Sequence, residues 1–211
     1  MSLLPDPAYD IQSAEALQAL YGPVDPRSQF KELDHLSPGY QALIRASPFF
    51  SLATSGPDGL DCSPRGDPRG FVEVLDAHTL VVPERRGNNR IDSLRNLLED
   101  PRVALLFLVP GVGETLRVNG RARLSTDPAL LTRHSVNGRL PKLLLVVEVQ
   151  RAYFQCSRAV VRADLWNPER HVPRGELPST GALLAEAGRR EDFDAEGYDA
   201  ALSARVRSTL Y

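Results

Sequence analysis

Short runs of apolar residues alternating with polar ones dominate residues 49–154, and most of them end at Gly, Pro, Asn or Asp. Such runs predict β-strands joined by tight turns. The clearest run covers 115–124, where every second residue faces one side and Gly120 predicts a β-bulge. Residues 103–109 and the start of 143–154 are continuously apolar, which predicts strands buried on both faces.

Further strands are predicted from shorter runs at 49–54, 60–65, 71–75 and 80–82. Helical patterns flank them. Ser13 is a predicted N-cap of a helix that ends near Tyr21, and Ser37 followed by Pro38 predicts the start of a second helix.

One helix interrupts the strands, at 89–98, where Ile91, Leu94 and Leu98 form an apolar stripe. An Asn at its start is the predicted cap. Short helices are also predicted at 128–134 and between Cys156 and Pro168.

Six or so antiparallel strands with few inserted helices favour a barrel over a βαβ sheet. We therefore predict one domain over 1–211, with a helical segment 1–47, a barrel core 48–156 and a helical segment 157–211. The tail from Gly181 is predicted to pack on the body or on a second subunit. A homodimer is predicted partly because the strand at 143–149 is apolar on both faces.

The composition excludes several classes of partner. The 211 residues are 42% hydrophobic and 25% charged, as in an average globular protein, and the net charge of −2 gives no field that would attract nucleic acid or anionic lipid. The longest apolar run, 103–109, is too short for a membrane helix. The first residues lack the basic and apolar regions of a signal peptide, so we expect a cytoplasmic protein with no membrane and no nucleic-acid partner.

Common catalytic and metal-binding patterns are absent. Cys62 and Cys156 lie far apart without a CxxC pair, so neither a disulfide framework nor a zinc site is predicted, and no metal is expected. The sequence has no GxxxxGK[ST], GxGxxG, GxSxG or HExxH motif. The four histidines are scattered, and each is interpreted as a surface or turn residue.

Two loops rich in Gly and Arg, at 63–67 and 85–90, follow predicted strands. The second leads into the helix predicted near Arg90, and backbone N–H groups at a helix start, beside guanidinium groups, suit a phosphate monoester. Alternatively, the residues at 87–89 form only a turn and a cap, with solvated arginines.

Two further features have alternative explanations. Thr115 and Arg117 share one face of their strand, and a half-buried Arg there needs an anionic partner, which is either a ligand or a carboxylate of the chain. Trp166, the only tryptophan, packs either in the core or against a planar ligand.

Four sequence blocks, taken in order, resemble those of the pyridoxamine 5′-phosphate oxidase-related flavoproteins; they are 63–67, 83–90, 106–111 and 114–120. Within that family the chain most resembles an FMN-dependent subgroup with the Arg-Gly-Asp and Gly-Asn-Asn-Arg loops. The resemblance runs from about Ser47 to Trp166. It implies an FMN-binding split β-barrel, mainly β with helical additions, six-stranded, antiparallel and of Greek-key type. It also implies a homodimer with FMN at the subunit interface.

In such proteins the segment matching 63–67 approaches the flavin ring and ribityl chain, and the segment matching 85–90 holds the phosphate. The residue matching Thr115 lies near the ring, and those matching Arg162 and Trp166 come from the partner chain. The candidate cofactor-binding residues are Ser63, Pro64, Arg65, Gly66, Asp67, Val82, Arg85, Asn88, Asn89, Arg90, Thr115, Arg117, Arg162 and Trp166. No catalytic residue is assigned.

The favoured function is an FMN-dependent oxidoreductase that acts on a small-molecule substrate, with the cofactor supplying the redox chemistry. The chain differs from the vitamin B6 oxidase itself in its Gly-Asn-Asn-Arg loop and in lacking an evident Arg-x-His near the C-terminus. Pyridoxamine phosphate is therefore not the predicted substrate. The alternatives are a non-catalytic flavin or haem carrier of the same fold, F420 in place of FMN, and a hydrolase or interaction protein with structural Arg loops.

Overall fold

The computed structural model describes residues 6–190 and 192–211, and these residues fall into two units that divide between residues 32 and 33. The first unit contains short helices: η1 (Pro7–Tyr9), α1 (Ala14–Leu20) and η2 (Pro26–Ser28). The Oγ of Ser13 accepts a hydrogen bond from the backbone N–H of Ala16, so the predicted cap of α1 is confirmed.

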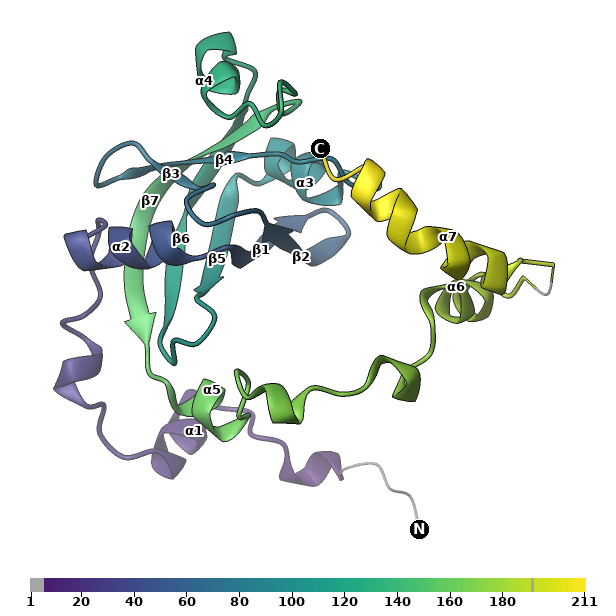
Figure 1. The fold of residues 1–211 in the computed structure, drawn as a ribbon. Helices are drawn as coiled ribbons and strands as arrows, with labels where there is room; N and C mark the ends of the chain where they lie inside the picture. Colours follow the sequence, from purple (N-terminus) through teal and green to yellow (C-terminus); the bar gives the residue numbers. More distant parts are fainter. Residues whose placement is uncertain (1–5, 191) are drawn as a thin grey trace. The chain divides into compact units, whose positions relative to one another are not determined.

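The second unit is built on one antiparallel sheet with the order β2-β1-β5-β6-β7-β4-β3 (Figure 1). Its strands are β1 (Phe49–Gly56), β2 (Gly59–Gly66), β3 (Glu73–Val74), β4 (Thr79–Pro83), β5 (Arg102–Leu108), β6 (Thr115–Ser125) and β7 (Leu144–Gln155). The prediction of a mainly β fold with helical additions is confirmed. The sheet has seven strands rather than six, and the strand predicted at 71–75 is reduced to the two residues of β3. Because β2 and β3 are left as edges, hydrogen bonds do not close the sheet.

Helices accompany the strands in the same unit. They are α2 (Pro38–Ala46), α3 (Asp92–Glu99), α4 (Pro128–Arg133), α5 (Arg158–Arg162), η3 (Pro168–Arg170), η4 (Arg174–Glu176), α6 (Thr180–Gly188) and α7 (Ala195–Ser208). As predicted, α2 begins with Ser37 as N-cap and Pro38 in its first turn.

One face of the sheet carries the main hydrophobic core. Phe50, Leu52 and Phe107 are fully buried there, and α2 adds Ile44. On β6 the register shifts between Asn119 and Gly120, which confirms the predicted bulge. A Cβ on Gly120 would collide with the backbone carbonyl of Glu148, so glycine is required by this close approach.

The start of β7 is buried on both faces, as predicted. Leu145 and Val147 belong to the main core, whereas Leu144 and Val146 form a second cluster with Leu130 and Leu131 of α4. The second face of β7 is therefore covered by the chain itself. This removes one of the reasons for predicting a dimer.

The strand at 103–109 differs from its prediction. Val103, Leu105 and Phe107 face the core, but Ala104, Leu106 and Leu108 on the opposite face are only half-buried. An uninterrupted apolar run therefore lies on a sheet whose outer face is incompletely covered within one chain.

The helix at 89–98 is shorter than predicted and faces differently. It begins at Asp92 after Ile91, which adopts a left-handed conformation with φ 57° and makes no side-chain cap. Leu94 and Leu97 are the buried leucines, whereas Leu98 is 73% exposed. The predicted Asn cap and the predicted stripe of Ile91, Leu94 and Leu98 are wrong, because the chain turns at Ile91 before the helix starts.

Candidate functional site

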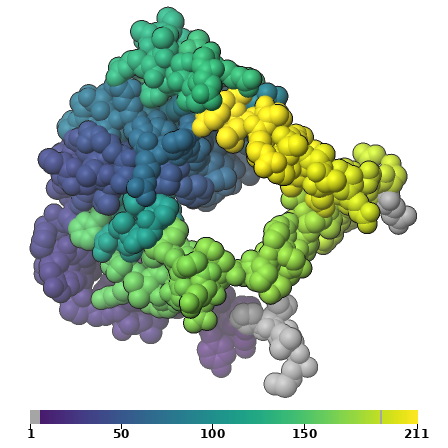
Figure 2. Space-filling model, viewed as in Figure 1, coloured from purple at the N-terminus to yellow at the C-terminus, as the bar shows by residue number. Residues whose placement is uncertain are grey.

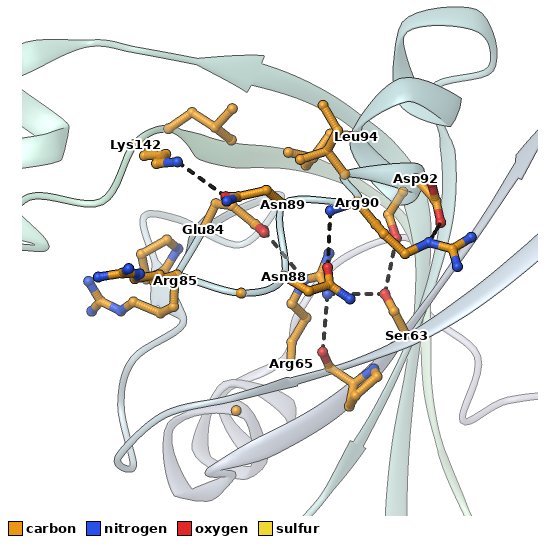
Figure 3. Close-up of a pocket in the computed structure, with 18 of the residues that line it drawn as sticks. Ser63, Arg65, Glu84, Arg85, Asn88, Asn89, Arg90, Asp92, Leu94 and Lys142 are labelled. Carbon is orange, nitrogen blue, oxygen red and sulfur yellow. Dashed lines mark hydrogen bonds and ion pairs between the residues drawn. The ribbon is translucent and has the colours of Figure 1, made fainter. Parts of the chain in front are cut away.

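The inner face of edge strand β2 is polar. Asp61, Ser63 and Arg65 lie opposite Thr54, Leu52 and Phe50 of β1, so they point to the same side as the core. Because β2 is at the edge, these side chains are covered by α3 and by the loop after β4 instead of by apolar residues (Figure 3).

A cavity of about 870 Å³ lies between these elements. Its lining includes Ser63, Arg65, Glu84, the loop from Arg85 to Asp92, and Lys142. It is large enough for a mononucleotide-sized ligand. The two predicted Arg loops, 63–67 and 85–90, therefore meet at one place, as expected if they form one site.

A chain of hydrogen bonds crosses the floor of the cavity. The Ser93 hydroxyl donates to Asp61 Oδ2 at 2.6 Å and lies 3.0 Å from Ser63 Oγ, and Arg65 Nη1 donates to Ser63 Oγ at 3.1 Å. The Ser93 residue is 5% exposed. Two hydroxyls thus connect a carboxylate at one end to the guanidinium of Arg65 at the other.

Arg65 also faces Glu84, a carboxylate that is not among the residues predicted from the sequence. Arg65 Nε lies 3.5 Å from Glu84 Oε2, and both side chains are about four-fifths buried (Figure 3). Neither atom has a hydrogen-bond partner. Burial raises the pKa of Glu84, and the nearby charge of Arg65 opposes that rise.

Two of the predicted phosphate-binding arginines already have carboxylate partners. Arg85 Nε donates to Asp67 Oδ2 at 2.6 Å, and Arg90 Nε donates to Asp92 Oδ2 at 2.8 Å. Arg85 and Arg90 lie at opposite ends of the loop in Figure 3. Arg85 also donates to the carbonyl of His134 at 2.9 Å, which fixes its direction.

Asp67 does not line the cavity. It is nearly buried between Arg85 and Tyr211, whose hydroxyl donates to Asp67 Oδ1 at 2.6 Å. This hydrogen bond raises the pKa of Tyr211. In Figure 2 the end of α7, in yellow, accordingly lies beside the α4 region, where Arg139 donates to the Tyr211 carbonyl at 2.5 Å.

Two other cations line the cavity without a carboxylate partner in the described part of the chain. Arg86 is exposed on the loop. Lys142, which precedes β7, donates to Asn89 Oδ1 at 3.3 Å. Arg86 belonged to the predicted loop but was not selected, and Lys142 could have been noticed as one of only two lysines in an Arg-rich chain.

Thr115 and Arg117 lie on the opposite, outer face of the sheet, where Leu106 is the neighbour of Arg117 on β5. Arg117 Nη1 donates to the Tyr153 hydroxyl at 2.9 Å, and its guanidinium lies 5.5 Å from that ring. With the Gln155 amide turned so that its oxygen faces Arg117, two further bonds of 2.9 and 3.1 Å form. These partners are neutral, so no ion pair to a carboxylate is seen at Arg117 among the described residues.

The remaining predicted cofactor-binding residues, Val82, Arg162 and Trp166, do not line the cavity. Val82 is buried in the core and does not line the cavity. Arg162 is exposed on α5. Trp166 is half-buried, and its indole N–H donates to the Val112 carbonyl at 2.8 Å, which ties the segment after β7 to the loop between β5 and β6.

Within residues 6–190 and 192–211, no cluster of three or more His, Cys, Asp or Glu side chains could hold a metal ion. In the same residues, no helix is both long enough and apolar enough to cross a membrane.

The family model described as pyridoxamine 5′-phosphate oxidase matches residues 36–156. No curated protein matches the chain. Among solved structures, HupZ of Group A Streptococcus is 19% identical with a TM-score of 0.47, and the match covers 57% of this chain and 94% of that one.

Two more solved structures are similar over the same part. General stress protein 26 of Bacillus anthracis is 16% identical with a TM-score of 0.42, over 54% of this chain and 88% of that one. An FMN-binding protein of Syntrophomonas wolfei is 12% identical with a TM-score of 0.41, over 54% of this chain and 86% of that one.

Proposed function

The chain belongs to the pyridoxamine 5′-phosphate oxidase family, and from this we infer that it is an FMN-dependent oxidoreductase acting on a small-molecule substrate. The observation that supports FMN most strongly is the cavity beside β2, which combines a cationic loop with a polar floor. When bound, FMN supplies the electron-transfer chemistry. The chain binds it, orients it and sets the charge around it.

The loop end of the cavity fits a phosphate. Arg86 and Lys142 have no carboxylate partner there, and Gly87, Asn88 and Asn89 add backbone and amide groups between them. A phosphate monoester is best held by several charge-assisted hydrogen bonds. We assign the phosphate to this end, with Arg90 contributing if it leaves Asp92.

The floor of the cavity fits the polar edge of a planar ring. Ser63, Arg65 and Glu84 lie there, and the buried Arg65 Nε and Glu84 Oε2 lack hydrogen-bond partners. Buried polar atoms of this kind are expected to find partners in a ligand or water. Arg65 would face the ring and favour any negative charge that develops on it.

We further infer that the working form is a homodimer. Arg65 and Arg117 lie on opposite faces of one sheet, so a single chain does not bring all candidate residues together. On the outer face Ala104, Leu106 and Leu108 of β5 are only half-buried, and Val161 and Leu165 after β7 are exposed. Pairing two chains through these surfaces would cover them and let Thr115, Arg117, Arg162 and Trp166 of one chain approach the cavity of the other.

A non-catalytic carrier of flavin or haem is the second candidate. Among the described residues, two of the three carboxylates that line the cavity are engaged in hydrogen bonds, Asp61 with Ser93 and Asp92 with Arg90, and no histidine lines it. A cavity with so few groups for proton transfer is compatible with binding alone.

An absorbance spectrum of the purified protein, before and after addition of FMN, tests the proposal. We expect one FMN per chain and bleaching of the bound flavin by NADH or NADPH, with recovery in air. Bound FMN that neither nucleotide reduces would favour the carrier. A protein that binds no FMN would refute both forms of the flavin proposal.

A further inference from the structure

Glu84 has a fixed position at the floor of the cavity. It follows the last residue of β4, and its backbone N–H donates to the carbonyl of Leu143 at 3.0 Å. Its side chain is 20% exposed. The carboxylate is therefore mostly shielded from solvent, and its charge acts on whatever occupies the cavity.

The contact between Glu84 and Arg65 is an incomplete ion pair. Glu84 Oε2 and Arg65 Nε lie 3.5 Å apart and belong to groups of opposite charge. They do not form a hydrogen bond with each other, and neither atom has another hydrogen-bond partner in the described residues. On its other side Arg65 is well held, because Nη1 donates to Ser63 Oγ and to the Pro64 carbonyl, each at 3.1 Å. Burying two charges without such bonds is unfavourable.

We propose that Glu84 is a built-in counter-anion for Arg65 in the empty cavity, and that Glu84 takes a proton from solvent when an anionic ligand brings its negative charge into the same cavity. Glu84 is thus a positioning residue, which holds the Arg65 guanidinium ready in the empty cavity. The inference rests on the proposed function, with FMN as the anionic ligand.

Electrostatics around Glu84 support this assignment. Burial already raises the pKa of Glu84, and Arg65 is the charge that counteracts it. A ligand phosphate bound at the loop end of the same cavity adds negative charge that opposes the effect of Arg65, so the neutral carboxyl of Glu84 becomes favoured. The other charged side chains lining the cavity are Asp61 on β2, Arg85, Arg86 and Arg90 on the loop, Asp92 at the start of α3, and Lys142.

Titration calorimetry of FMN binding at pH 7.5, in two buffers with different ionisation enthalpies, measures the protons taken up. We expect the wild-type protein to take up between a few tenths of a proton and about one proton per FMN, and Glu84→Gln to take up none. A phosphate monoester with a second pKa of about 6 would release protons on binding to cations, so uptake cannot come from the ligand.

Affinity provides a second measurement. Glu84→Gln removes the competing charge and should bind FMN about tenfold more tightly at pH 7.5, whereas neutral riboflavin should bind the two proteins nearly equally. Asp92→Asn is the matched control, because it removes a carboxylate from the same cavity that pairs with Arg90, and it should keep the proton uptake. Arg65→Gln should lose the uptake, which provides a second variant if Glu84→Gln does not fold.

The possible failures are distinct. FMN binding to the wild-type protein without proton uptake, or equal uptake by wild type and Glu84→Gln, overturns the role of Glu84 and leaves the proposed function intact. Absence of FMN binding to wild type and to Glu84→Gln overturns both.

Discussion

Adjacent arginines on the loop after β4 have different surroundings. Arg85 is held by Asp67, whereas Arg86 has no carboxylate partner in the described residues and lines the cavity. Residue type and spacing predicted a cationic loop correctly, but they did not predict which guanidinium is available. That depends on Asp67, 18 residues earlier, and on where the backbone turns.

Arg86→Ala and Lys142→Ala are each expected to weaken FMN binding by about tenfold or more, because each removes a charge-assisted contact of about 1.5–3 kcal/mol to the phosphate. Binding of riboflavin, which lacks the phosphate, should change little. Fluorescence titration with both ligands measures this. The matched control is Arg69→Ala, since Arg69 is exposed and does not line the cavity. Equal FMN affinities for Arg86→Ala, Lys142→Ala and wild type would contradict the phosphate assignment.

The raised pKa of Glu84 makes the free energy of unfolding depend on pH. Its pKa in the folded protein lies above that of the unfolded chain, so the folded state favours the protonated form. The stability it contributes is present at low pH and is lost as pH rises through the folded pKa. Glu84→Gln, which mimics the neutral form, should therefore have a higher Tm than wild type at pH 7.5 and the same Tm near pH 4. Thermal unfolding followed by circular dichroism measures both, and a lower Tm at pH 7.5 would contradict the prediction.

Among the elements, α3 shows how a tertiary contact selects between neighbouring leucines. The sequence pattern favoured Leu98, but Leu97 is 5% exposed and packs in the main core. The left-handed Ile91 sets where the first turn begins, and a shift of one residue rotates a helix by about 100°. The helix was predicted correctly, and its buried face was not.

Leu97→Ala and Leu98→Ala form a matched pair that tests this face. Leu97→Ala should lower the free energy of unfolding by about 2–5 kcal/mol, because it removes buried methyl groups and leaves a cavity. Leu98→Ala should change it by no more than about 0.5 kcal/mol. Denaturant unfolding measures both values. The assignment would be wrong if the two variants were equally destabilised.

At the scale of the whole molecule, the candidate cofactor-binding residues are divided between the two faces of one sheet. The cavity lies on the inner side of β2, while Arg117 and Leu106 lie on the outer face. The second apolar face at the start of β7, from which the sequence predicts a partner chain, is covered by α4. The surfaces that favour a dimer are therefore the outer face of β5 and the exposed apolar residues that follow β7.

Light scattering at micromolar concentration should give about twice the chain mass of 23.2 kDa. Leu106→Arg, which places a charge on the half-covered outer face, should reduce the mass to that of one chain and weaken FMN binding. Leu98→Arg is the control, because Leu98 is exposed on α3, and it should leave the mass unchanged. A wild-type mass of 23.2 kDa would refute the dimer.

Alternating residues on β6, the bulge at Gly120 and the caps at Ser13 and Ser37 were predictable from the sequence. Each depends on contacts between residues close in the chain or on a strict period of two. The family resemblance, from about Ser47 to Trp166, overlaps most of residues 36–156, which the family model matches.

Pairing between distant residues could not be predicted in this way. Whether Arg85 or Arg86 is available, whether Glu84 faces Arg65, and whether α4 or another chain covers β7 all depend on which segments the fold brings together. Local periodicity indicates that a side chain is buried or exposed on its own element, but it carries no information about its partner. The chemistry of the cavity therefore follows from residue types known in advance and from pairings that exist only in the folded chain.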